Sequence, residues 1–168
     1  MNGKPLWMDL TRDDARDQFE QHLVKSYPLL FPILSLPKEQ LGNGWMPISG
    51  FGIECGPGWW PILDEACQQI EAINRKIAET NPDSVIIAHQ IKEKFGGLRF
   101  YTNFCNDEVD AIIRLAEEQC SKTCESCGAL GKLYTTGYWL STDCEKCKRD
   151  GAIDYETFVN QPEEPEKS

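Results

Sequence analysis

Four of the eight cysteines form two pairs with identical internal spacing. Cys124 and Cys127 are the first pair, Cys144 and Cys147 the second, and together they read C-x2-C-x16-C-x2-C. This spacing is typical of a four-thiolate zinc site, because a two-residue gap lets two thiolates converge from one tight turn. Gly128 would help to close the first turn. The spacing also leaves open two disulfides or a redox pair.

A zinc ion held by four cysteines has no free coordination position. We therefore expect Zn²⁺ to be structural and not to activate water. Strand-like segments at 132–135 and 138–141, with a turn at Thr136-Gly137, would form the hairpin that joins the two cysteine pairs. Lys148 occupies the place after Cys147 where the first pair has a glycine. Lys146, Lys148 and Arg149 are expected to offset thiolate charge.

Two further residues are candidates for catalysis. Cys55 lies among glycines and could be a nucleophile, although a small packed residue is the simpler interpretation. His89 has Glu93 on the same side of an expected strand and could be a general base, or only a packing residue. The chain has no Walker loop, G-x-S-x-G or H-E-x-x-H motif. We therefore expect that the protein is not an enzyme.

Two groups of residues are candidates for partner binding. Trp59 and Trp60 are adjacent, so one of them could face solvent as a binding anchor, unless both cover the hydrophobic body. Lys92, Lys94 and Arg99 form a compact basic cluster that could touch phosphate or an acidic partner. A solvated strand face that resists aggregation is the alternative for this cluster.

Apolar periodicity and turn residues predict the elements that carry these residues. Helices are expected over 12–26, over 61–79 and from Asn106 or Asp107, which are good N-caps. A β-hairpin is expected over 85–104, turning at Gly96-Gly97. Short strands are expected near 45–48 and 51–54 in an otherwise irregular segment.

This order predicts an α+β fold in which helices pack on a small antiparallel sheet and a C-terminal zinc ribbon follows. The expected division is an α+β body over 1–123, the four-cysteine ribbon over 124–150, and an acidic, partly disordered tail over 151–168.

The composition limits the classes of partner. The chain has 27 acidic and 17 basic residues, a formal charge of -10, and a pI near 4.7. A broad nucleic-acid surface or an anionic membrane surface would need clustered cations, so a basic protein partner is favoured. The N-terminus lacks a basic start followed by an apolar stretch, and 28–36 is too short to span a bilayer. We therefore expect a cytoplasmic protein.

Three stretches resemble a widespread family of uncharacterised phage and prophage proteins. They are 54–59 (ECGPGW), 90–101 (QIKEKFGGLRFY) and 124–128 (CESCG), and the resemblance covers roughly 45–147. It implies a small accessory protein inside a bacterial host cell, but it supplies no catalytic residues.

These observations predict a zinc-stabilised, acidic protein-binding module. Its partner would be a basic host protein or nucleoprotein complex, and inhibition of a bacterial defence complex by occupying a basic surface fits the resemblance. A nucleic-acid-associated zinc-ribbon factor is the alternative, and a small enzyme using Cys55 or His89 is a third. The sequence does not predict the oligomeric state.

Overall fold

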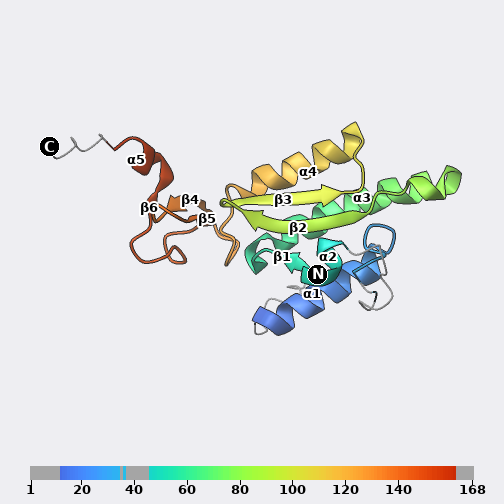
Figure 1. The fold of residues 1–168 in the computed structure, drawn as a ribbon, viewed down its shortest axis with the longest axis horizontal. Coiled ribbons are helices and arrows are strands. Elements are labelled where there is room, and N and C mark those ends of the chain that lie inside the picture. The colour runs from blue at the N-terminus through green and yellow to red at the C-terminus, as the bar shows by residue number, and fades with distance from the viewer. Residues whose placement is uncertain (1–11, 35, 37–45, 162–168) are drawn as a thin grey trace, which may run out of the picture.

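The computed structural model describes residues 12–34, 36 and 46–161, and these form an α+β body followed by a small C-terminal ribbon (Figure 1). The fold class predicted from the sequence is confirmed. The body contains α1 (Arg12–Ser26), α2 (Pro47–Phe51), β1 (Ile53–Glu54), η4 (Pro57–Trp59), α3 (Trp60–Thr80), η5 (Pro82–Ser84), β2 (Ala88–Lys94), β3 (Gly97–Thr102) and α4 (Asp107–Cys120). The ribbon contains β4 (Lys132–Thr135), β5 (Leu140–Asp143), β6 (Ile153–Asp154) and α5 (Tyr155–Val159).

The three long helices of the body lie where apolar periodicity predicts them. Phe19 of α1 is fully buried and stacks on Trp60 of α3, with ring centroids 4.9 Å apart. The side chain of Asn106 accepts a hydrogen bond of 2.9 Å from Val109 N–H, which confirms the predicted N-cap of α4. No helix in the described ranges combines the length and the apolar character needed to cross a membrane.

The body sheet has the order β1-β2-β3, with β1 parallel to β2 and β2 antiparallel to β3. α4 packs along β3 and against α3, so the buried face of the sheet meets the apolar stripe of α4 (Figure 1). Leu98 and Phe100 of β3 contribute to this core, as do Val109 and Ala116 of α4. The turn between β2 and β3 lies at the end of the sheet that is next to the ribbon (Figure 1).

The predicted hairpin forms, but its turn lies one residue earlier than expected. Lys94 pairs with Gly97, so Phe95 and Gly96 are the turn residues, with φ angles of 56° and 75°. The Glu93 carboxylate accepts the N–H of Gly96 at 2.6 Å and stabilises this turn. Phe95 is 68% exposed at this turn. A bulge between Ala88 and Gln90 shifts the alternation along β2.

The irregular segment before α3 differs in part from the prediction. The expected strand near 45–48 is wrong over its described residues, because Pro47 begins the short helix α2. Proline favours the first turn of a helix, and Ser49 caps this turn by accepting a hydrogen bond from Met46 N–H. The strand expected near 51–54 is confirmed only over Ile53–Glu54 as β1, because Phe51 is the last residue of α2.

The ribbon is docked on the body through backbone contacts. Gly58 N–H donates to the Glu125 carbonyl at 2.7 Å, and Gly56 N–H donates to the Glu125 carboxylate at 2.7 Å. At the other end of the contact, the Thr142 hydroxyl donates to the Gly96 carbonyl at 2.6 Å. A Cβ on Gly58 would lie 2.1 Å from the Cys124 carbonyl oxygen, so only glycine permits this approach.

The segment after the second cysteine pair adds to the ribbon. β6 pairs with β4 to complete a sheet of order β5-β4-β6, and α5 follows directly. The Asp154 carboxylate accepts the N–H of Glu156 at 2.9 Å, and it pairs with Lys132 at 2.6 Å. The range 151–168 thus contains ordered elements that the sequence analysis did not predict. Residues 162–168 lie outside the described residues.

Candidate metal centre and surrounding residues

The four cysteines of the repeated motif converge. The Sγ atoms of Cys124, Cys127, Cys144 and Cys147 all lie within 4.8 Å of one another, and Cys127 and Cys144 are 3.7 Å apart. A tetrahedral zinc site with Zn–S bonds of about 2.3 Å requires sulfurs about 3.8 Å apart. A disulfide requires about 2.05 Å, and all eight cysteines are free thiols. The donor set therefore fits a structural metal ion.

Two turns and one hairpin bring the sulfurs together. Gly128 N–H closes the first turn by donating to the Cys124 carbonyl at 2.9 Å, with φ of 76° at Gly128, as predicted. The second turn closes without glycine, because the N–H groups of Cys147 and Lys148 both donate to the Cys144 carbonyl. Antiparallel pairing of β4 with β5 places the two turns side by side.

The electrostatics of the thiols favour a bound cation. Burial raises the pKa of Cys124, although the N–H groups of neighbouring residues such as Ser126 oppose this. A hydrogen bond with Cys144 and burial raise the pKa of Cys147. Burial alone would raise the pKa of Cys144, but the Lys146 N–H and the adjacent thiols lower it to about 7. Four thiolates at this spacing therefore need a positive ion between them.

Two of the three basic residues that follow the second cysteine pair, Lys148 and Arg149, have partners other than the sulfurs. Lys148 pairs with Glu145 at 2.8 Å and lies 5.1 Å from the centroid of the Tyr134 ring. The Arg149 guanidinium lies 4.8 Å from the centroid of the Trp139 ring. These contacts differ from the expected role of offsetting thiolate charge. They instead place a cation on an aromatic face at the edge of the ribbon.

The two groups of predicted partner-binding residues have different surroundings. Trp59 and Trp60 are 0% and 1% exposed, so the prediction that one of them anchors a partner is wrong. Their indole N–H groups explain the burial, since they donate to main-chain carbonyls inside the protein. Lys92 and Arg99 are cross-strand neighbours, and Lys94 is exposed two residues further along β2. The three basic residues therefore lie close together on the β2–β3 hairpin.

The two candidate catalytic residues are poorly placed for chemistry. Cys55 is 8% exposed, and burial raises its pKa well above the ordinary value, with the charge of Glu125 adding to the effect. A thiol of this kind is a weak nucleophile. The Nε2 atom of His89 is buried without a hydrogen-bond partner among the described residues. The Glu93 carboxylate accepts the Gly96 N–H and does not orient this imidazole.

A serine, a histidine and an aspartate meet at the end of α1, which sequence analysis missed. His22 Nε2 lies 2.6 Å from an Asp64 carboxylate oxygen, and Ser26 Oγ lies 3.4 Å from His22 Nδ1. The two residues that follow Ser26 offer no N–H to an oxyanion, because Pro28 has no N–H and Tyr27 N–H donates to the Leu23 carbonyl. The Tyr27 hydroxyl also donates to Asp64. The network therefore fastens α1 to α3.

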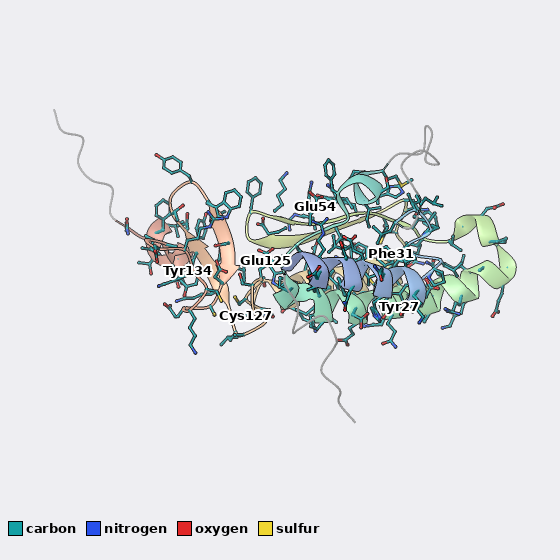
Figure 2. The ribbon with its side chains drawn as sticks, turned by 90° about the horizontal axis from the view of Figure 1, so that it is seen from below. Tyr27, Phe31, Glu54, Glu125, Cys127 and Tyr134 are labelled. Carbon is teal, nitrogen blue, oxygen red and sulfur yellow. The ribbon has the colours of Figure 1, made fainter. Side chains whose placement is uncertain are left out.

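A groove of about 1310 Å³ lies where the ribbon meets the body. The loop 55–58 and the start of α3 form its body side, and the first cysteine turn, β5 and the second cysteine turn form its ribbon side. Figure 2 shows Glu125 and Cys127 at this junction. Trp139 and Arg149 also line the groove. No sequence pattern identified this site, because its walls come from residues far apart in the chain.

Comparisons with known proteins do not assign the chain to a family. No family model matches it, and neither a curated protein nor a solved structure matches it significantly. The function must therefore be inferred from the sequence and from the surface and geometry of the described residues.

Proposed function

We propose that this protein is a zinc-stabilised acidic module that binds a basic protein. The apolar surface of the ribbon carries the proposal. Seven of the thirteen exposed large apolar side chains among the described residues lie between 130 and 159. Leu130 is 86% exposed, Tyr138 is 102% exposed and Trp139 is 50% exposed. Exposed apolar side chains concentrated on one small unit are typical of a protein-binding surface.

Charge supports a basic partner. The formal charge is -10, and four thiolates with one Zn²⁺ would make it more negative by about two units. Such a charge accelerates association with a cationic surface. Added salt screens this attraction and weakens the complex. The proposed ion is zinc, because four thiolates in a tetrahedral arrangement are the donor set of structural zinc sites.

The test is capture of partners from a bacterial lysate with zinc-loaded protein at low and moderate ionic strength. The expected result is a basic protein that is retained at low salt and released at moderate salt. Leu130→Ala on the ribbon should weaken retention, whereas Leu115→Ala on α4, which removes an exposed leucine (51%) from the body, should not. Equal retention by the two variants, or capture of no basic protein, would refute the proposal.

A narrower proposal concerns the biological role. The resemblance to phage proteins supports a cytoplasmic inhibitor that acts inside a bacterial host. A defence complex that binds nucleic acid has a cationic groove, which an acidic protein can occupy. Purified defence complex should then lose nucleic-acid binding when the protein is added, and binding should recover as salt is raised. Unchanged nucleic-acid binding in the presence of excess protein would remove this role.

A second candidate, direct nucleic-acid binding, has one supporting observation. Lys92 lies 6.0 Å from the centroid of the Tyr101 ring, and Lys94 lies 5.1 Å from that of Phe95. Cations beside exposed aromatic rings are typical of single-strand binding surfaces. A gel-shift titration with wild type and with a triple charge reversal at Lys92, Lys94 and Arg99 decides this candidate. Binding that the reversal abolishes would favour it over a protein partner.

A further inference from the structure

The groove between the body and the ribbon is larger than most sites for small molecules. Its volume is about 1310 Å³, whereas pockets for small ligands span roughly 300–1000 Å³. The two walls are held together, because Glu125 of the ribbon accepts hydrogen bonds from Gly56 and Gly58 of the body. A preformed groove of this size suits a peptide segment in an extended conformation.

Two acidic side chains of the groove, Glu54 and Glu93, have no ion-pair partner among the described residues. Glu54 accepts a hydrogen bond from the Gln90 amide at 3.2 Å, and Glu93 accepts one from the Gly96 N–H at 2.6 Å. Both donors are neutral, and within the described ranges no Lys, Arg or His nitrogen lies within 4.0 Å of either carboxylate. The groove therefore attracts a cation.

The two basic residues of the groove are already engaged. The Arg16 guanidinium donates to Glu20 at 3.1 Å and also to the Phe51 carbonyl. The Arg149 guanidinium lies over the Trp139 ring at 4.8 Å. This last contact shows that the indole of Trp139, which is half-exposed, accepts a guanidinium group. Guanidinium stacks on aromatic rings better than ammonium does.

The geometry points to this groove as the binding site for an arginine-containing basic segment of the partner. Its arginines pair with Glu54 and Glu93, and one of them stacks on Trp139. Arginine suits these contacts because its planar group combines stacking with paired hydrogen bonds to carboxylates. This inference deepens the proposed function and rests on it for the identity of the partner as a protein.

The test uses full-length, zinc-loaded protein and a fluorescein-labelled peptide of four Arg-Gly repeats, with a Lys-Gly peptide for comparison. The groove variant is Glu54→Gln with Glu93→Gln, since glutamine still accepts both hydrogen bonds. The matched control is Glu79→Gln with Glu108→Gln, which changes the net charge equally. Both residues are exposed, one in the last turn of α3 and one in the first turn of α4. These two helix ends lie at the end of the body away from the ribbon (Figure 1).

Fluorescence anisotropy should show Arg-Gly binding weakened by about two- to thirtyfold in the groove variant, since each of the two exposed ion pairs contributes roughly 0.2–1 kcal/mol. The control should change affinity by less than about twofold. Wild type should prefer Arg-Gly over Lys-Gly, and Trp139→Ala should reduce that preference, because the carboxylates of Glu54 and Glu93 remain.

Three outcomes would overturn the inference: no binding of the Arg-Gly peptide, equal weakening in the groove and control variants, or equal affinity for the two peptides. The lysate capture separates this failure from failure of the proposed function. If the groove variant captures a basic protein from the lysate as fully as wild type does, and the capture is sensitive to salt, the proposed function is supported. The partner then binds at a surface other than the groove.

Discussion

Gly58→Ala should lower the free energy of unfolding, because it forces the ribbon away from the body. The added Cβ would lie 2.1 Å from the Cys124 carbonyl oxygen, 2.5 Å from Gly128 N and 2.7 Å from the Glu125 carbonyl oxygen. All three atoms belong to the backbone of the first cysteine turn, which its own Gly128 N–H to Cys124 carbonyl hydrogen bond closes. No flexible side chain can move aside, so the two backbones must separate.

The expected loss follows from the contacts that this separation breaks. Overpacking costs about 1–3 kcal/mol. The hydrogen bonds from Gly58 N–H to Glu125 and from the Trp59 indole to Thr123, both 2.7 Å long, contribute about 0.5–1.5 kcal/mol each. The free energy of unfolding should therefore fall by about 2–6 kcal/mol, a large part of the roughly 5–15 kcal/mol of an ordinary domain.

Urea denaturation followed by tryptophan fluorescence measures this loss, at a fixed concentration of free zinc because bound metal shifts the unfolding equilibrium. Gly137→Ala is the matched control. A Cβ there meets no atom within 4 Å, and its φ of 90° costs only the strain of a left-handed conformation, about 1–2 kcal/mol. If Gly58→Ala loses no more than this control, the argument that backbone contact docks the ribbon is refuted.

Three further predictions concern the metal, the thiols and a buried carboxylate. Removing zinc with a chelator, or substituting Cys127→Ser, should abolish the NMR dispersion of residues 124–160 and leave the helical circular dichroism of the body mostly intact; a ribbon that stays folded without metal would contradict the structural role. In the zinc-loaded native protein a thiol reagent should titrate Cys105 alone, which is exposed, and chelation should add four more thiols; five reactive thiols before chelation would mean that the cluster holds no metal. Burial raises the pKa of Glu71, so the folded state binds more protons than the unfolded state between the ordinary and the raised pKa, and stability falls as pH rises through that interval. As pH rises above the ordinary glutamate pKa of 4.5, wild type should therefore lose unfolding free energy relative to Glu71→Gln. A flat or opposite trend in urea midpoints would contradict the burial effect.

Local sequence patterns determined the helices, the hairpin and the metal ligands. The N-cap at Asn106 and the turn at Gly128 were predictable because each depends on hydrogen bonds between residues three or four positions apart. The cysteine spacing identified its ligand set for the same reason, since each pair closes its own turn. The exact turn of the hairpin was not predictable, because Phe95 adopts a positive φ that sequence rules reserve for glycine.

Only the tertiary structure decided what the remaining motif residues do. Trp59 is buried because its indole N–H finds the Thr123 carbonyl, 64 positions away in the sequence. The glycines at 56 and 58 are needed because the chain of the ribbon passes against them. The groove exists only where these two distant segments meet. Burial and close approach depend on long-range packing, which local spacing does not encode, and the proposed binding site depends on that packing.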